Sequence, residues 1–500
     1  MEPATRPGSY GWSIHSGKRK SDGMAVCVFK ASKAKLIQTP LSQYFGNNFP
    51  VTVGKDRVDP NCQLFPALHH FAKSKTLVHP YLLKVYATLD TDAPVDTAAP
   101  SSGNIHAGPY ATKGTTGDLV IVTERVTSLR KWLDEQHEQT SEKLAWGLVC
   151  LVKALDFLHT HAKMSHAALS LDSVFVTPGG DFKLGNFSLL MHTGHSDQGA
   201  TNISRDEHEH FRKYESYVCP SAYRSPERVN SEYDFIFNSL PSHVMDSFSL
   251  GVLIDDLYEG NSVPDKLVKA VARLKTPSAT QRPRIGPLLK CPALDVPHCK
   301  SMEFLEEIAV KPAEEKIAFY QSVPDQLSRR VITQDAAKYK LLPSMMLSLK
   351  AITGNPQAVS QDVTRREVMA IIPPLFSIGE SLDDASFQSQ LAPLIATLFQ
   401  LNDRGIRAAL LNRLPAFTAR LDKQSINSCV FEPMCTGFTD SSAALRELTL
   451  KSTLPLISNL NSVNIEKLGR YLIRLQSDNE DSIRTNTVIF ISKVRRNFFW

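Results

Sequence analysis

The sequence predicts a two-lobed α+β domain followed by an all-α solenoid of helical repeats. In the first part, β-rich segments come early and strongly apolar helices follow, which is typical of a small sheet lobe joined to a helical lobe. From about residue 300 onward strand patterns disappear, and amphipathic helices succeed one another with short breaks. We therefore expect a first domain over residues 1–292 and a second over residues 293–500.

The composition is that of an ordinary globular protein. The 500 residues are 42% hydrophobic and 21% charged, and their net charge of +5 is a weak bias for a long nucleic-acid footprint. The eight cysteines include no CxxC pair, which argues against a zinc site or a disulfide framework. The first residues lack an apolar signal core, and no run of about 18 apolar residues occurs. We expect a reducing, intracellular compartment.

Three segments of the first domain are rich in β-branched and aromatic residues and predict strands. They are residues 24–30, 79–89 and 119–126. Three others carry apolar residues at helical spacing and predict helices. They are residues 63–78, 141–161 and 246–260. Two polar stretches, 90–118 and the His-rich 191–215, predict loops.

One element of the second domain recurs. An arginine follows an apolar residue and precedes another apolar residue by four positions, at Arg407, Arg446 and Arg484, so the intervals are 39 and 38 residues. This period is typical of HEAT-type helical repeats that share a core; three unrelated amphipathic helices are the alternative. Each arginine is expected to bond to an acidic side chain or a carbonyl between repeats, and lining a binding groove is the alternative. Earlier helices of the same stack are expected at 336–351, 365–379 and 388–401.

Residues 165–190 resemble the catalytic core of a protein kinase. His166 and Leu169 match the signature H-R-D-L-x-x-x-N, and Phe187 matches the centre of D-F-G. The positions that carry the chemistry are replaced. Ala167 stands for the Arg, Ala168 for the catalytic Asp, Ser173 for the metal-binding Asn, Asn186 for the D-F-G Asp and Ser188 for its Gly.

Each replacement removes a specific function. Ala168 has no atom that could accept the proton of a substrate hydroxyl, and a positioned general base contributes roughly 10²–10⁴-fold to the rate. Asn186 offers a neutral carbonyl where magnesium prefers a carboxylate, and Ser173 is shorter than Asn and a poorer ligand. Together they leave phosphoryl transfer without its base and with a weakened metal site.

The upstream kinase chemistry is also missing. Cys27 aligns with the strand lysine that pairs with the phosphates; a shifted alignment would place Lys30 there, and only one of the two can face the pocket. We favour Cys27, as a buried structural thiol and not a reactive one. The helix glutamate that would orient this lysine is replaced by His70. The glycines Gly8, Gly11 and Gly17 do not form G-x-G-x-x-G.

The structural kinase positions are present. Ser225, Pro226 and Glu227 resemble the A-P-E segment, Asp246 the buried Asp of the following helix, and Arg282 the Arg near the end of the domain. The hinge is expected to begin at Thr123 and Glu124. A vestigial nucleotide pocket is therefore expected near Thr123, Glu124 and Asn186.

With landmarks such as "FAKSKTLVHPYLL", "WGLVCLVKALDFLH" and "FTARLDKQSI", nearly the whole chain resembles the SCYL (Scy-like) family of pseudokinases. The resemblance implies a kinase-like domain with HEAT repeats and agrees with the Cys27 alignment. It also implies a role in Golgi–endoplasmic reticulum traffic through coatomer, or, as in a related fungal branch, in cytoplasmic steps of tRNA export. The traffic-linked members end in a long tail with a basic motif, for which Arg495 and Arg496 are no convincing substitute. We expect that the chain is truncated or lacks this tail.

These observations favour a catalytically inactive scaffold, without metal or cofactor, that binds coatomer or other traffic components, the tRNA-export machinery or tRNA itself. A cytoplasmic location follows, with a peripheral position at the Golgi or the nuclear envelope as a further implication. The alternatives are a divergent active kinase and an ATP-binding protein without full transfer. The nearest carboxylates, Asp172 and Asp181, are out of register for the first. The loop histidines His192, His195, His208 and His210 are expected to be solvated rather than metal ligands.

Overall fold

The computed structural model describes residues 11–41, 51–53, 56–59, 61–92, 114–135, 141–193, 202–259, 262–354, 362–401 and 403–494. The chain divides into two compact units, Met1–Met302 and Glu303–Trp500. The sequence places the boundary before helix α10 (Pro297–Glu307), whereas the structural division falls inside this helix. Gly8, His195, Arg495, Arg496 and most of the predicted loop 90–118 lie outside the described residues.

The first unit begins with a four-stranded antiparallel sheet in the order β1-β2-β6-β5. Its strands are β1 (Ser13–Lys18), β2 (Ala25–Ser32), β5 (Val85–Asp90) and β6 (Asp118–Glu124). The predicted strands at 24–30 and 119–126 are confirmed, while the one predicted over 79–89 begins only at Val85. Two short strands, β3 (Val51–Val53) and β4 (Asp56–Val58), form a separate ribbon.

The helices of the first unit follow the predicted apolar segments. Short α1 (Lys33–Gln38) and the predicted α2 (Leu64–Ser74) accompany the sheet. The long α4 (Ser141–Phe157) buries eleven residues from Leu144 to Leu155 and ends in a π-helical turn, Leu158–Ala162. It packs against α8 (His243–Leu257), which carries the predicted apolar segment. Small strands close the unit's second half: β7 (Thr127–Ser128), β8 (Met164–Ser165), β9 (Val174–Val176), β10 (Phe182–Leu184) and β11 (Met191–His192).

The prediction of a loop over residues 191–215 is wrong, because most of it is helix α5 (Asn202–Val218). Among its many charged residues, this helix carries apolar residues at helical spacing, of which Phe211, Tyr214 and Val218 are buried. Helix α5 packs along α2, where the rings of His210 and His69 stack 4.4 Å apart. His210 is therefore buried and not solvated. Its contact with His69 joins segments that are distant in the sequence, so no local sequence pattern indicates it.

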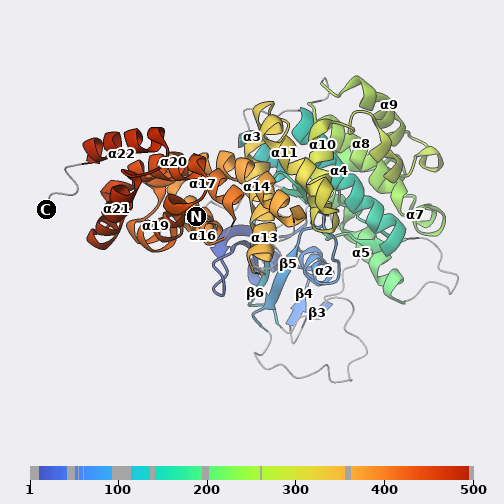
Figure 1. Ribbon diagram of the computed structural model, residues 1–500. Helices are drawn as coiled ribbons and strands as arrows, with labels where there is room; N and C mark the ends of the chain where they lie inside the picture. Colours follow the sequence, from blue (N-terminus) through green and yellow to red (C-terminus); the bar gives the residue numbers. More distant parts are fainter. Residues whose placement is uncertain are drawn as a thin grey trace. The chain divides into compact units, whose positions relative to one another are not determined.

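The second unit is a stack of helix pairs, shown in orange and red in Figure 1. The first helices of successive pairs pack on one another: α11 (Ala313–Ser328), α14 (Asp362–Glu380), α17 (Arg404–Phe417) and α20 (Ala443–Thr453). The second helices are α13 (Leu342–Thr353), α16 (Ala392–Phe399), α19 (Phe431–Cys435) and α21 (Ser462–Leu475), and α22 (Asp481–Val494) follows. The predicted fold class, a kinase-like domain with a helical solenoid, is confirmed.

The same local design opens several second helices. The N-cap side chains of Asp383, Asp422 and Asn461 each accept a backbone N–H three residues on, and these caps recur every 39 residues. A π-helical turn follows two of these caps and ends just before a new helix with a proline near its start, as at Pro393. Proline lacks an N–H and crowds the carbonyl four residues earlier, so the backbone widens there.

Two of the three recurring arginines form hydrogen bonds to Asp478, in the turn before α22. Arg446 donates to both carboxylate oxygens of Asp478 in the next repeat at 2.7 Å, as predicted. Arg484 donates to the carbonyl oxygen of Asp478 at 2.7 Å, within its own repeat. Arg407, in contrast to these two arginines, is buried, and its Nε has no hydrogen-bond partner within the part of the chain that the structure describes.

Candidate functional site

The backbone of the catalytic-loop equivalent is held by one buried carboxylate. The amides of His166 and Ala167 donate to Asp246 at 2.7 and 2.8 Å, and Nε2 of His159 lies 2.8 Å from it. Burial alone would raise the pKa of Asp246, but these hydrogen bonds outweigh it and hold the pKa below its usual value. Asp246 on α8 is thus an anchor of the loop, as its kinase-like position implies.

The position of the catalytic base carries only a methyl group. Ala168 is fully buried, and its amide donates to Nδ1 of His166 at 3.3 Å. Ala167 before it has φ +60°, a backbone conformation that non-glycine residues rarely adopt. The loop is therefore held in a specific conformation, although the side chain at the base position, Ala168, cannot accept a proton.

Ser173 is committed to a local turn. Its hydroxyl donates to the carbonyl oxygen of Ser170 at 2.8 Å and accepts from the amide of Ser170 at 3.0 Å. Both bonds run between the Ser173 hydroxyl and the backbone of Ser170, across a short 3₁₀ turn, Leu171–Ser173. A hydroxyl so engaged is a poor metal ligand.

Asn186 stands where magnesium needs a carboxylate. Its Oδ1 accepts a hydrogen bond from the hydroxyl of Ser188 at 2.7 Å, and the side chain is almost fully buried. Its Nδ2 has no hydrogen-bond partner among the residues described. An amide donor repels a cation, so this residue and Ser173 do not fit a magnesium–nucleotide complex.

His70 occupies the helix position of the missing glutamate. Its Nδ1 accepts the backbone N–H of Phe187 at 3.1 Å, and Trp12 meets its ring edge-on at 5.4 Å. Burial lowers the pKa of His70 to about 3, so the ring is neutral at pH 7. The neutral imidazole therefore links α2 to the D-F-G-like segment.

The side chain of Cys27 is buried in the interior of the first unit, whereas that of Lys30 is exposed on its surface. The Cys27 thiol is buried, 3.3 Å from the carbonyl oxygen and 3.4 Å from the amide nitrogen of Val126. Lys30 is exposed and pairs with Asp118 of the neighbouring strand at 2.8 Å. Neither residue offers a cation to a pocket.

The side chains of both expected hinge residues form hydrogen bonds to backbone groups. The hydroxyl of Thr123 donates to the carbonyl oxygen of Glu124 at 2.9 Å, and the Glu124 carboxylate accepts from the amide of Lys84 at 2.9 Å. Burial raises the pKa of Glu124. In this arrangement both side chains serve the fold.

An aromatic pair that the motifs do not predict joins strands β2 and β9. Phe29 on β2 and Phe175 on β9 meet edge to face, with ring centroids 5.3 Å apart, and both are buried. Phe29 follows Cys27 by two residues and so shares its strand face, which is the pattern that could have indicated it.

The carboxylates nearest to the lost positions are engaged elsewhere. Asp172 accepts from Nε and Nη2 of Arg130 at 2.9 and 3.2 Å, and buried Asp181 accepts from Nε1 of Trp146 at 2.8 Å. The A-P-E equivalent is intact, since Arg282 donates to both oxygens of buried Glu227 at 2.6 and 2.7 Å. Structural kinase contacts thus persist where catalytic ones do not.

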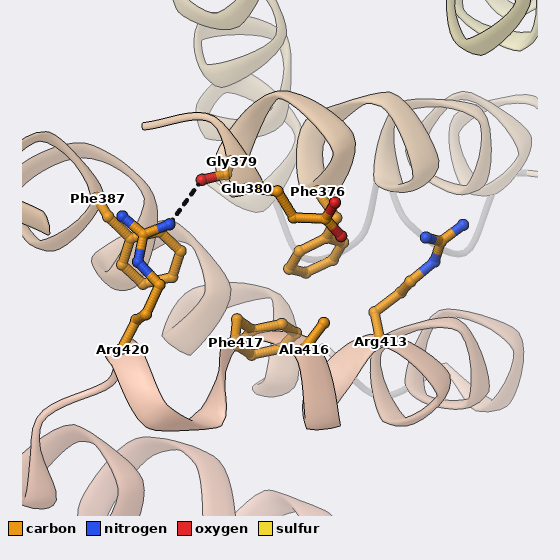
Figure 2. A pocket seen from close by; sticks show the side chains of 8 residues that line it. All are labelled: Phe376, Gly379, Glu380, Phe387, Arg413, Ala416, Phe417 and Arg420. Carbon is orange, nitrogen blue, oxygen red and sulfur yellow. Dashed lines mark hydrogen bonds between the residues drawn. The ribbon is translucent and has the colours of Figure 1, made fainter. Parts of the chain in front are cut away.

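The helical unit carries a pocket of about 110 Å³ between α14 and α17 (Figure 2). The stacked rings of Phe376 and Phe417, 4.7 Å apart, line it, and Arg420 covers Phe387 while donating to the carbonyl oxygen of Gly379 at 2.9 Å. Glu380 and Arg413 are exposed at its edge, and within the described ranges neither forms an ion pair. The pocket thus has an aromatic floor with one acidic and one basic side chain at its edge.

No protein-family model matches the chain. It is 25% identical over 494 residues, 97% of this chain and 51% of the relative, to "Probable inactive serine/threonine-protein kinase scy1" of Dictyostelium discoideum. It is 26% identical over 467 residues, 88% of this chain and 50% of the relative, to "Cytoplasmic export protein 1" of Saccharomyces cerevisiae. The chain thus spans about half the length of these curated relatives.

A solved structure, "Crystal structure of Cex1p", matches 99% of this chain and 80% of that chain with a TM-score of 0.61 and 23% identity, which supports the fold. The fold and the degenerate cleft define a pseudokinase, a kinase-like domain in which the catalytic positions are replaced. The chain is similar to several SCY1-like (SCYL) proteins, among them "Protein kinase-like protein SCY1" of Saccharomyces cerevisiae, 24% identical over 56% of this chain and 38% of that relative.

Proposed function

We propose that the chain is a catalytically inactive scaffold, whose kinase-like unit transfers no phosphate and whose helical unit binds partner proteins. The observation that carries the proposal is the loop at Ala168. Asp246 holds its backbone while the base position bears a methyl group, so the architecture is kept and the chemistry is lost. Fold alone would suggest a kinase, but function depends on the residues of the site.

The nucleotide site is proposed to be vestigial. Phe29 on β2 and Phe175 on β9 meet edge to face and are both buried, and we propose that this pair fills the space that a nucleotide base would need. Cys27, His70 and Asn186 offer no lysine, no glutamate and no carboxylate. The scaffold needs no cofactor or metal.

Two other functions remain as alternatives. A divergent kinase would need another base, and Asp172 and Asp181 are both engaged in other contacts. An ATP-binding protein with residual phosphotransfer would need room beside Phe29. Both alternatives are weaker than the scaffold on these grounds.

The partner classes come from resemblance. The tRNA-export machinery, or tRNA, is supported by the yeast relative "Cytoplasmic export protein 1". Coatomer and other Golgi traffic components are supported by the resemblance to the SCYL family. A cytoplasmic chain at the surface of the Golgi or the nuclear envelope suits both classes. In the described part of the chain, no helix is long and apolar enough to cross a membrane.

Two assays test the proposal. Transfer of labelled phosphate from ATP to the chain itself and to general acceptor proteins should equal that of a heat-inactivated sample. Binding of purified coatomer, tRNA-export components and tRNA should show affinity for at least one of them. Phosphate transfer above background would overturn the scaffold, and failure of all three ligands would remove its partner classes.

A further inference from the structure

A second cavity, of about 450 Å³, lies in the first unit on residues that the scaffold proposal does not use. It forms where four segments distant in sequence converge: the end of the π-helical turn after α4, strand β11, the start of α8 and the stretch before a 3₁₀ turn, Gly286–Lys290. Its volume lies within the range of roughly 300–1,000 Å³ that is usual for small-molecule sites.

Each segment brings a basic side chain to the cavity. They are Lys163, His192, His243 and Arg284. Lys163 and Arg284 are exposed, and neither has a carboxylate partner in the part of the chain described. Burial lowers the pKa of His243, and the lysine and the arginine supply permanent positive charges.

The acidic groups nearby are largely engaged. Asp246 is buried beneath the cavity wall and bonds to His159 and the loop amides. Glu207 binds the backbone and Nδ1 of His192 and forms an ion pair with Lys73, so Nε2 of His192 is left for another partner. Asp156 is the one carboxylate on the wall, and it lies against the backbone of Gly286.

Hydroxyl groups complete the wall. Thr160, Thr193 and Ser242 each line the cavity. Ser242 donates weakly to the carbonyl oxygen of His159 at 3.3 Å, so its hydroxyl can turn to a ligand at little cost. Among the described residues, no group of three His, Cys, Asp or Glu side chains could hold a metal ion. The histidines here therefore do not indicate a metal centre.

The chemistry that matches this wall is a phosphate monoester. Such a group carries about −1.5 to −2 charges and three strong acceptor oxygens, which need several donors from different directions. An arginine fork and a lysine point charge are the usual pair for it, and hydroxyls supply the remaining bonds. We propose that this cavity binds the phosphate group of a small, soluble phosphate monoester. The site is independent of the scaffold's partners.

The test is titration calorimetry of the whole chain with glycerol 3-phosphate, inorganic phosphate and, at equal ionic strength, chloride. The test variant is Lys163→Asn with Arg284→Gln. Asn is chosen because Lys163 has φ +55°, which Asn tolerates. The control is Lys269→Gln with Arg273→Gln, which removes the same charge from exposed positions of α9 (Asp265–Leu274).

We expect glycerol 3-phosphate to bind the wild type and the control with equal affinity within twofold, and the test variant at least tenfold more weakly. Should the test variant melt at a lower temperature than the control, Arg284→Gln alone is used, because this side chain is exposed. The proposal is overturned if the ester binds no better than chloride, if only inorganic phosphate binds, or if the test variant binds as tightly as the control. None of these outcomes bears on phosphate transfer or partner binding, so the two proposals fail separately.

Discussion

Nδ1 of His70 accepts a hydrogen bond from the backbone nitrogen of Phe187 at 3.1 Å. This bond joins α2 to the D-F-G-like segment, and it exists only while the ring is neutral. An active kinase joins the same two regions through ions: a lysine, a glutamate and a metal-bound aspartate. Here a neutral hydrogen bond replaces the ionic link, so the contact between α2 and the D-F-G-like segment stabilises the fold and does not bind a nucleotide.

The neutral link predicts a dependence of stability on pH. The folded pKa of His70 is about 3, whereas the ordinary value is 6.5. Below pH 6.5 the unfolded chain therefore binds a proton that the folded chain does not, so stability is full above pH 6.5 and falls as the pH drops toward 3. We expect a slope of about 1.4 kcal/mol per pH unit from this histidine.

His70→Gln checks this, because an amide oxygen can still accept the bond but does not titrate. Urea unfolding of the first unit at pH 7, 6 and 5 should show a shallower loss of stability in the variant, by about one proton. Equal slopes in the two proteins would mean that His70 does not carry the effect.

The buried pair Glu227–Arg282 should be a major contributor to the stability of the first unit. Arg282→Met leaves the Glu227 carboxylate buried without its partner, and breaking such a pair costs about 3–5 kcal/mol. The matched control is Lys300→Met, which breaks the exposed pair with Asp295 and should change little. The measurement is the free energy of unfolding; similar losses in both variants would contradict the assignment.

Asp172→Ala and Asp181→Ala should leave function intact and differ in stability. Asp181→Ala removes the carboxylate that accepts from the buried Nε1 of Trp146 and should cost about 1–3 kcal/mol, while Asp172→Ala removes the partner of a half-exposed arginine at smaller cost. Partner affinity and labelled-phosphate transfer are compared with the wild type. A phosphate transfer activity that either substitution abolishes would sink the scaffold account.

The pocket in Figure 2 should contribute to partner binding. Ala416→Trp would fill it from α17, and we expect at least a tenfold loss of affinity for a partner that the wild type binds, without a change in melting temperature. Ala385→Trp, also at an exposed position of this unit, is the control. Unchanged affinity in Ala416→Trp would place the partner on another surface.

Much of the fold could be predicted from local pattern. The strands around Cys27 and Thr123 and the helices around Trp146 and Asp246 carry strong apolar periodicity, and the spacing of Arg446 and Arg484 indicates the repeats. These features depend on residues close in sequence, which a single chain shows.

What was missed depends on contacts between distant segments. The sequence predicts a loop at helix α5 because charged residues outnumber its apolar stripe. His210 is buried in contacts with distant residues, among them His69 of α2 and the carbonyl oxygen of Ser188. The pair Phe29–Phe175 joins two strands that are separated by about 150 residues in the sequence. The replaced catalytic positions could be named from the motif, but not the bonds that now occupy Ser173 and His70.

The most direct test of the central claim is a thermal melt of the purified chain with saturating ATP, with and without magnesium. A ligand at about 100 times its dissociation constant adds roughly 2.7 kcal/mol, which would raise the melting temperature by a few degrees. The account predicts no shift, because Phe29 and Phe175 pack together in the buried interior and Asn186 and Ser173 offer no metal site. A magnesium-dependent rise of a few degrees would contradict it and restore the case for an enzyme.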